Sequence, residues 1–421
     1  MIKPTDGMVI TEDTLLEPGV YFVPNGIRII EDGITLDGNG ATIIGRARDG
    51  RGIQVKDQQG VTIKNLKLRD FYHGVYARRC KDLTITDCQI TSTAEVAANT
   101  VFLDIWLDAE RAYGGGILLQ EVEDSTISRN DLQHQMNGLL TYGCARLTVR
   151  ENNASYCSAF GIHLYGTSDS LFEENFADYC TRWQPRGGRS GHMGADAAGF
   201  LVVAGASRNI FRRNYARMGG DGFFVAGLNP RFEFRPCNNN LFEENDVSYS
   251  PNIGFEATFC ASNVFRNNTV HACNYGFWLG FSATNVLQNN TINHCIQAGI
   301  AVENGYGFVV HENRLFGNTH GILLWSKHIP QFDTIVPKNG TSYNWRIERN
   351  TFQRHDKAIR IAANQDHGVR DYPAGGQRPY NHLIEANTIT DNRIGIELAG
   401  VERTVMKHNN LAQNVEADVQ E

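Results

Sequence analysis

The chain has 421 residues and a formal net charge of −7; 41% of its residues are hydrophobic and 20% are charged. This composition can fill a large core and differs from that of a disordered chain. The sequence contains no block of basic residues and no run of 18 apolar residues, so we expect neither a nucleic-acid partner nor a membrane partner.

The N-terminal stretch "MIKPTDGMVITEDTLL" has no cationic region followed by an apolar stretch. We therefore expect a cytoplasmic protein, with secretion after removal of a signal peptide as the alternative. Residues 1–30 are expected to form an N-terminal cap, residues 31–415 the body and residues 416–421 a C-terminal tail. The tail is short and leaves the end of the body thinly covered, which favours a homo-oligomer.

Asn or Asp recurs along the body, mostly after 22 or 23 residues where nothing is inserted. A repeat of this length indicates a solenoid in which equivalent residues stack. The recurring positions are 63–65 ("IKN"), 85–87 ("ITD"), 128–130 ("SRN"), 150–152 ("REN"), 173–175 ("EEN"), Asn214, Asn245, Asn268, Asn290, Asn313, Asn350, Asn387 and Asn410.

A second motif, Gly-apolar-x-apolar, follows most of these positions after roughly ten residues, as in "GIHL" at 161 and "GFWL" at 276. The stretches between turn residues alternate with period 2, are rich in Val, Ile, Phe and Thr, and show no helical periodicity. These features predict an all-β chain, a single right-handed parallel β-helix solenoid of about 13 or more coils with loop insertions. The recurring Asn side chains are expected to hydrogen-bond along the stack.

The stretch "GITLDGNGATIIG" at 33–45, together with these coils, resembles the pectate-lyase-like right-handed parallel β-helix superfamily. The resemblance implies the fold and a carbohydrate-active protein. That superfamily contains hydrolases, lyases, epimerases, transferases and noncatalytic repeat proteins. No catalytic motif of its polygalacturonases or mannuronan epimerases is present, so the resemblance assigns no catalytic residue.

The nine cysteines include pairs at equivalent places of the repeat, Cys157 with Cys180 and Cys273 with Cys295. No Cys-x-x-Cys spacing occurs. We expect buried structural thiols, no metal ion and no cofactor.

Five insertions interrupt the period, and all border the Gly-apolar-x-apolar strand. Loops at such places often wall a binding face, so this strand is expected to form the floor of a groove. The insertions lie near residues 91–113, 181–196, 228–238, 326–344 and 365–380. Their aromatic and basic side chains suit contacts with sugar rings, hydroxyls and acids.

Alternation along the floor strand predicts which side chains point out of the coil. The outward positions bring His, Glu, Trp and Tyr together among the insertions. With the loop residues, they give the candidate substrate-binding set: His163, Tyr165, Arg182, Trp183, Arg189, His192, Trp278, Glu303 and Trp325.

Asp196, Asp221 and Glu256 fall on neighbouring coils of the predicted floor. Cleavage of a glycosidic bond needs two carboxyl groups, one as acid and one as base or nucleophile. We expect two of these three to be catalytic, although Asp beside glycine is also common in turns.

The favoured function is a glycoside hydrolase, or a related glycosyl transferase, acting on a poly- or oligosaccharide. A uronan lyase or epimerase is the first alternative, because the Arg and His residues near 182–192 could neutralise a uronate. A noncatalytic glycan-binding or assembly rod is the second.

Overall fold

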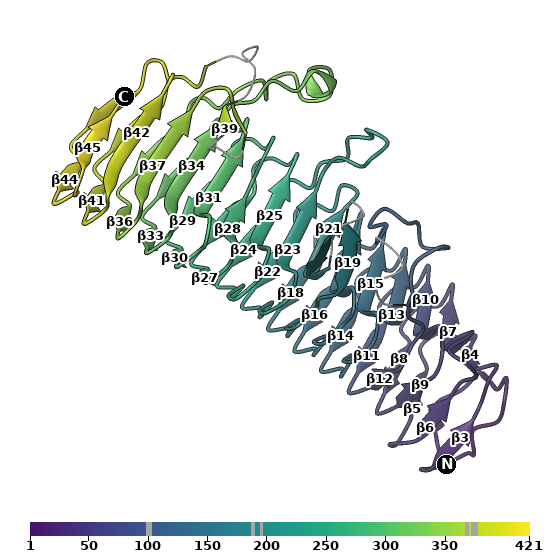
Figure 1. Cartoon of the computed structure of the whole chain (residues 1–421). Helices are drawn as coiled ribbons and strands as arrows, with labels where there is room; N and C mark the ends of the chain where they lie inside the picture. The colour runs from purple at the N-terminus through teal and green to yellow at the C-terminus, as the bar shows by residue number, and fades with distance from the viewer. Residues whose placement is uncertain (98–102, 187–189, 194–196, 367–369, 372–377) are drawn as a thin grey trace. The chain divides into compact units, whose positions relative to one another are not determined.

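A computed structural model describes residues 1–97, 103–186, 190–193, 197–366, 370–371 and 378–421. The chain divides into two compact units, Met1–Asp221 and Gly222–Glu421, which we call unit 1 and unit 2. Figure 1 labels the strands.

Unit 1 consists of parallel strands stacked into three sheets, which we name the floor sheet, the ladder sheet and the third sheet. Its floor sheet contains β1 (Val9–Ile10), β4 (Ile27–Ile29), β7 (Arg51–Lys56), β10 (His73–Arg78), β13 (Gly115–Gln120), β15 (Asn137–Tyr142), β17 (Phe160–Tyr165) and β21 (Ala198–Val203). Its ladder sheet contains β2 (Thr14–Leu15), β5 (Thr35–Asp37), β8 (Thr62–Lys64), β11 (Thr84–Thr86), β14 (Thr126–Ser128), β16 (Thr148–Arg150), β18 (Leu171–Glu173) and β22 (Ile210–Arg212). Its third sheet contains β3 (Val20–Phe22), β6 (Thr42–Ile44), β9 (Lys67–Arg69) and β12 (Gln89–Thr91).

Unit 2 repeats the same three sheets, and β23 (Asp221–Ala226) crosses the boundary with its first residue. Besides β23, its floor sheet contains β25 (Ile253–Thr258), β28 (Tyr275–Trp278), β31 (Ala298–Glu303), β34 (His320–Trp325), β37 (Lys357–Ala362), β42 (Ile394–Ala399) and β45 (Ala417–Gln420). Its ladder sheet contains β24 (Leu241–Glu243), β26 (Val264–Arg266), β29 (Val286–Gln288), β32 (Val309–His311), β35 (Arg346–Glu348), β40 (Leu383–Glu385) and β43 (Val405–Lys407). Its third sheet contains β27 (Thr269–His271), β30 (Thr291–Asn293), β33 (Arg314–Phe316), β36 (Thr351–Gln353), β41 (Thr388–Thr390) and β44 (Asn410–Ala412).

Each unit is a right-handed parallel β-helix, as the repeat predicted. The described residues contain one short helix, the 3₁₀ turn η1 (Pro330–Phe332), so the all-β class is confirmed. Parallel pairing already joins β1 to β4 and still joins β42 to β45. The paired strands therefore extend into both terminal segments, 1–30 and 416–421, that were expected as cap and tail.

A glycine stands at the second position of most floor strands because the coils approach too closely for a side chain there. A β-carbon on Gly254 would lie 2.7 Å from the carbonyl oxygen of Gly276, and one on Gly276 would lie 2.5 Å from that of Gly299. Real β-carbons do not approach backbone oxygens so closely, so the motif glycine is required sterically.

Aromatic stacks fill the interior of unit 2. Phe223, Phe255 and Phe277 occupy equivalent inward positions, with ring centroids 5.2 and 5.0 Å apart along the stack. Phe242 and Phe265 of the ladder sheet stack at 4.7 Å and meet the first set edge-on. Such offset and edge contacts add to the burial of apolar area that stabilises each coil.

A ladder of hydrogen-bonded asparagines runs along the ladder sheet. Three of the residues that the sequence repeat assigned to this ladder are wrong, because each lies one residue away from the true ladder position. The buried ladder of unit 1 starts at Asn130, which bonds Asn152; Asn65 and Asp87 precede the equivalent positions, which hold Leu66 and Cys88. Near the C-terminus, Asn387 donates to Asn409 rather than to Asn410. In each case the polar residue taken for the ladder stands at a neighbouring position of the corner.

All nine cysteines are buried and none forms a disulfide bond, as expected for structural thiols. Burial raises the pKa of Cys88 and of Cys144 to about 12, so these thiols stay protonated at neutral pH. They fill space as small apolar side chains.

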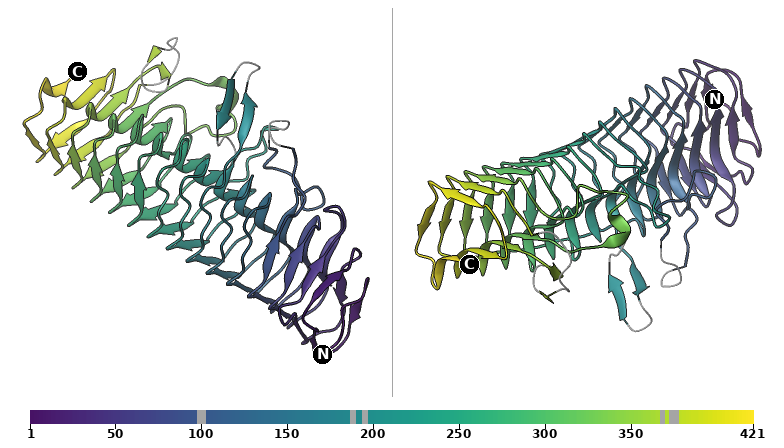
Figure 2. Two further views of the ribbon diagram at one scale, coloured as in Figure 1. Left: turned by 60° about the horizontal axis from the view of Figure 1, so that its bottom comes forward. Right: turned by 90° about the horizontal axis from the view of Figure 1, so that it is seen from above.

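The insertions leave the coils at the ends of the floor strands. In unit 1, one insertion precedes β13 and another precedes β21. The insertion before β21 contains the antiparallel hairpin β19 (Trp183–Arg186) and β20 (Ser190–Met193). Figure 2 shows this hairpin projecting from the coils. In unit 2, insertions follow β23, β34 and β37; the last contains the hairpin β38 (Gln365–Asp366) and β39 (Arg370–Asp371).

Candidate functional site

The floor sheet presents three columns of outward side chains, at the first, fourth and sixth positions of each strand. The register of the fourth column is as predicted: Glu256 pairs with Trp278, and Trp278 with Ala301. The sequence analysis named only Asp221 from the first column, because strict alternation would turn this position inward. Glycine at the second position lets two successive residues face the core, and this glycine is the signal that could have revealed the column.

Unit 2 holds an aromatic cluster on its floor. The indole of Trp278 meets Tyr275 edge-on at 4.8 Å and Trp325 at 5.5 Å. Trp325 is buried with Leu323 beneath the partly buried Trp278 and Tyr275. The two outer rings therefore provide a firm apolar surface that is still reachable from solvent.

Two glutamates flank this cluster. Glu256 is the coil neighbour of Trp278 in the fourth column, and Glu303 pairs with Trp325 in the sixth column, two coils beyond Glu256. Both glutamates are partly exposed. Unit 2 thus brings together four of the predicted residues, namely Glu256, Trp278, Glu303 and Trp325.

A basic group lies further along the same floor, where sequence reasoning assigned no site. The ammonium group of Lys357 contacts both carboxylate oxygens of Glu397 at 2.9 Å, and Arg360 also pairs with Glu397. Burial, and next Arg360, lower the pKa of Lys357. Burial also lowers the pKa of the neighbouring His320, whose Nδ1 lies 3.1 Å from the carbonyl of Gln297.

The segment 326–344 lies along one edge of the unit 2 floor. The side-chain amide of Asn339 donates to the carbonyls of Ser282 and Asn304, at 3.2 and 2.7 Å. Asn304 in turn donates to the carbonyl of Lys327 at 2.7 Å. These bonds fix the segment beside the ends of β28 and β31.

Unit 1 holds His163 on its floor, in register with Leu140 and Leu201. The imidazole is only 4% exposed, and neither ring nitrogen has a hydrogen-bond partner among the described residues. Burial lowers its pKa to about 3, so the ring is neutral at pH 7. Tyr142 and Tyr165 contact it edge-on, with centroids 5.4 and 6.5 Å away.

The insertion before β13 covers part of the unit 1 floor. Ala112 is buried against Tyr76, Leu118 and Tyr142, while Tyr165 packs at the margin. The guanidinium of Arg182 donates to the carbonyl of Ala97 at 3.1 Å, and burial lowers the pKa of Arg182. His163, Tyr165 and Arg182 therefore all belong to unit 1, beside this insertion.

The remaining predicted residues are placed as follows. Asp221 is the first residue of β23, has 1% exposure, and donates its backbone N–H to Ala197, so it is a strand residue rather than a turn residue. Trp183 and His192 lie in β19 and β20. Asp196 and Arg189 fall outside the described residues.

The sequence model of one protein family, described as "Right handed beta helix region", matches residues 102–238 and 229–333, more than half of the chain. The chain belongs to this right-handed β-helix family. No curated protein gives a significant match to this β-helix protein.

Solved structures similar to this β-helix protein include the A-module of a mannuronan C-5 epimerase from Azotobacter vinelandii, with 14% identity and a TM-score of 0.50 over 94% of this chain and 89% of that one. A periplasmic alginate epimerase shares 11% identity with a TM-score of 0.41, over 93% of this chain and 78% of that one. DFA-IIIase from Arthrobacter chlorophenolicus A6 shares 12% identity with a TM-score of 0.38, over 65% of this chain and 69% of that one. At these identities the likeness shows the fold alone.

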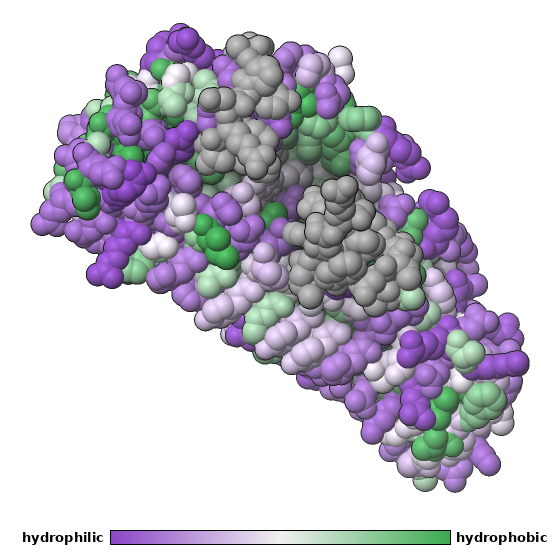
Figure 3. Space-filling model, in the orientation of Figure 1, coloured by the Kyte–Doolittle hydropathy of each residue, from purple (hydrophilic) through white to green (hydrophobic). Residues whose placement is uncertain are grey.

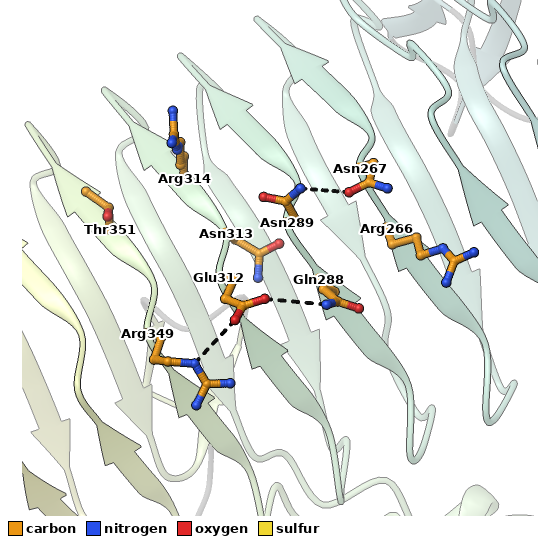
Figure 4. Close-up of a pocket in the computed structure, with 9 residues that line it drawn as sticks. All are labelled: Arg266, Asn267, Gln288, Asn289, Glu312, Asn313, Arg314, Arg349 and Thr351. Carbon is orange, nitrogen blue, oxygen red and sulfur yellow. Dashed lines mark hydrogen bonds and ion pairs between the residues drawn. The ribbon is translucent and has the colours of Figure 1, made fainter.

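A polar concavity of about 580 Å³ lies at a corner of unit 2, between its ladder and third sheets. Figure 4 shows that its side chains mostly bond one another: Asn289 donates to Asn267 at 2.7 Å, and Gln288 and Arg349 both donate to Glu312 at 3.4 Å. We therefore interpret this concavity as a polar surface corner of the coil stack.

No group of three or more metal-ligating His, Cys, Asp or Glu side chains occurs among the residues that the structure describes. Within the same residues, no helix has the length and apolar character needed to cross a membrane.

Proposed function

We propose that this β-helix protein is a carbohydrate-active enzyme that binds a poly- or oligosaccharide across the floor of unit 2 and cleaves or transfers a glycosidic bond there. One arrangement supports this most directly: Glu256 and Glu303 flank the partly exposed indole of Trp278. An aromatic face between two carboxyl groups offers a surface for a sugar ring and the two groups that glycosidic cleavage requires.

The coil spacing sets the separation of these carboxyl groups. Glu256 and Glu303 are two coils apart at about 4.8 Å per coil and two residues apart along the strand at about 3.3 Å per residue, so their backbones lie roughly 12 Å apart. Inverting enzymes hold their carboxyl groups about 6.5–9.5 Å apart, which leaves room for a water molecule, and the flexible glutamate side chains can reach this range. One carboxyl group protonates the glycosidic oxygen as the bond to C1 breaks. The other takes a proton from the water that attacks C1 from the opposite face.

This site pairs Glu256 with Glu303, whereas the sequence suggested Asp221 or Asp196 as its partner. The reason is accessibility: Asp221 is almost fully buried, while both glutamates are partly exposed on one floor. A catalytic role of Asp221 stays a prediction, and its test is given below.

The decisive experiment is a screen of the full-length protein against soluble polysaccharides and oligosaccharides for new reducing ends. On a substrate so identified, Glu256→Gln and Glu303→Gln are each expected to lower turnover by about a hundredfold or more, because neither amide can exchange a proton. Glu402→Gln, at an exposed residue of the same unit, is the control. Proton NMR of the first product distinguishes inversion from retention. Turnover above about a tenth of wild type in either floor variant would reject the pair.

A uronan lyase or epimerase is a second candidate, favoured by His320 and its neighbours Lys357 and Arg360 on the floor of unit 2. An imidazole with a lowered pKa can accept the C5 proton of a uronate, and Lys357 and Arg360, which share the carboxylate of Glu397, leave one net positive charge beside it. In a lyase the electron pair of the broken C5–H bond forms the C4–C5 double bond, and the glycosidic oxygen leaves from C4. Growth of absorbance from an unsaturated uronate, abolished by His320→Gln, would establish this candidate over hydrolysis.

A further inference from the structure

An apolar pocket of about 350 Å³ lies past the C-terminal ends of β25 and β28, between the segments 228–238 and 326–344. Its lining includes Phe234, Phe259, Phe281, Val336 and Lys338. In Figure 3 hydrophobic side chains gather beside the segment that carries η1. We propose that this pocket binds a small aromatic carboxylate, with its ring against the phenylalanines and its carboxylate at Lys338.

The backbone at two lining residues is unusual for their type. Phe259 and Phe281 follow the sixth floor position and have φ of 56° and 54°. After β31 and β42 the corresponding left-handed residues are Asn304 and Gly400, types that adopt this conformation readily. Asn is therefore a replacement for Phe259 that keeps the backbone conformation of this position.

The phenylalanine rings make a preformed apolar wall. Phe259 and Phe281 stack with centroids 4.9 Å apart and an interplanar angle of 6°. Phe332 of η1 meets both edge-on, at 5.1 and 4.9 Å. Asn339 anchors the same segment through its two hydrogen bonds to the coil carbonyls. Because these contacts hold the wall in place, the pocket is open without a rearrangement, which is typical of small-molecule sites.

The charge of the lining selects the ligand. Lys338 is the one charged residue of the pocket lining, it is exposed, and it forms no ion pair with a described residue. The lining amide groups already have partners: Asn339 bonds the coil carbonyls, and Asn238 accepts the N–H of Ala261 at 2.6 Å. An apolar body with one anionic end therefore fits best. The volume lies near the lower limit of about 300 Å³ for ligand pockets, which suits a single ring.

The test uses the full-length protein and two probes of the same shape, benzoate and the neutral benzamide, titrated by calorimetry or ligand-observed NMR. We expect saturable binding of benzoate at one site per chain. Phe259→Asn removes a ring and suits the left-handed backbone, so the variant should fold while its benzoate affinity falls by about tenfold or more. Lys338→Gln should weaken benzoate by roughly threefold to tenfold and leave benzamide binding unchanged.

The matched control is Tyr249→Asn, which replaces another exposed aromatic residue of unit 2 at a φ of 65°, outside the pocket. It should bind benzoate like wild type. Absence of saturable binding, or equal binding by Phe259→Asn, would overturn the proposal. Sedimentation gives a further outcome: a wild-type dimer that Phe259→Asn dissociates, without benzoate binding, would assign the pocket to a second copy of the chain. None of these readouts depends on glycan turnover, so they succeed or fail separately from the proposed function.

Discussion

The side chain of Asn268 donates from Nδ2 to Oδ1 of Asn290 on the next coil over 2.9 Å, and the same Oδ1 accepts the backbone N–H of Asn268 at 3.0 Å. Asn268 also donates to the carbonyl of Phe242 on the preceding coil at 3.0 Å. One buried amide thus joins three coils of unit 2.

Asn268→Ala should therefore destabilise unit 2 strongly. It removes the bonds of the Asn268 side chain to two buried backbone groups, the N–H of Asn245 and the carbonyl of Phe242, and we expect a loss of about 2–4 kcal/mol in the free energy of unfolding, measured in urea. The control is the adjacent, exposed Asn267→Gly, which keeps the left-handed backbone and should change stability by less than about 0.5 kcal/mol. If both variants lost the same stability, the result would contradict the asparagine ladder as a source of stability.

Gly276→Ala tests the close approach of the coils. The new β-carbon would lie 2.5 Å from the carbonyl oxygen of Gly299, so backbone must shift, and we expect a loss of about 2 kcal/mol or more. Gly340→Ala is the matched control, because nothing lies within 4 Å of the position that its β-carbon would take. Thermal unfolding of the two variants compares them directly, and a Gly276→Ala protein as stable as wild type would contradict the steric argument.

Four buried histidines predict how stability depends on pH. Burial lowers the pKa of His73, His355 and His382 to about 4, and that of His163 to about 3. Below pH 6.5 the unfolded chain binds protons at these residues and the folded chain does not, so stability is complete above pH 6.5 and falls on acidification. For each histidine, the free energy of unfolding should fall by about 2 kcal/mol between pH 6.5 and pH 5.

Urea unfolding at pH 7 and pH 5 measures this effect. The salt-bridged carboxylates, such as Asp57 and Asp87, have lowered pKa values and titrate below this window. Their contribution is lost only at more acidic pH, so the window isolates the histidines. A stability that stays constant between pH 7 and pH 5 would show that the buried imidazoles accept protons in the folded state.

His163→Leu should raise stability, and it tests whether this residue contacts a sugar. Both neighbours in its column, Leu140 and Leu201, are leucines, and the change removes two ring nitrogens without partners among the described residues. We expect a gain of about 1 kcal/mol at pH 7, and a larger gain at pH 5. If His163 contacts a sugar, as predicted, the affinity for the identified glycan falls. A destabilised variant would instead show that the imidazole has a structural partner.

Asp221→Asn tests the remaining sequence-based candidate. The change keeps the shape of a buried side chain and removes its ability to ionise. A catalytic Asp221 predicts a folded protein whose turnover is lower by about a hundredfold or more. Loss of folding, seen by circular dichroism, with unchanged activity per folded molecule, would make Asp221 structural.

The sequence was informative about whatever repeats. Glycine at the second floor position and apolar residues at the third and fifth recur because every coil meets the same steric limits, so the fold and the fourth column followed from spacing alone. The same reasoning misplaced Asn65, Asp87 and Asn410 by one residue, because corner and ladder positions both favour Asn and Asp.

The candidate site depends on features that do not repeat. The segment that anchors Asn339 and the hairpin β19–β20 bring residues together through contacts specific to one insertion, for which spacing gives no information. Burial of Asp221 was also unforeseen, because a flanking glycine suggests a turn although the residue begins a strand. His320 and Lys357 were missed because they belong to the first column.

The insertions join the coils only at the ends of floor strands, so the regular corners that carry the asparagine ladder stay uninterrupted. An inserted segment can therefore be lengthened, shortened or exchanged while the neighbouring coils keep their register. The inserted segments and the asparagine ladder therefore consist of different residues of this chain. Loops transplanted from one floor strand to another provide a route to new binding specificities on an unchanged scaffold.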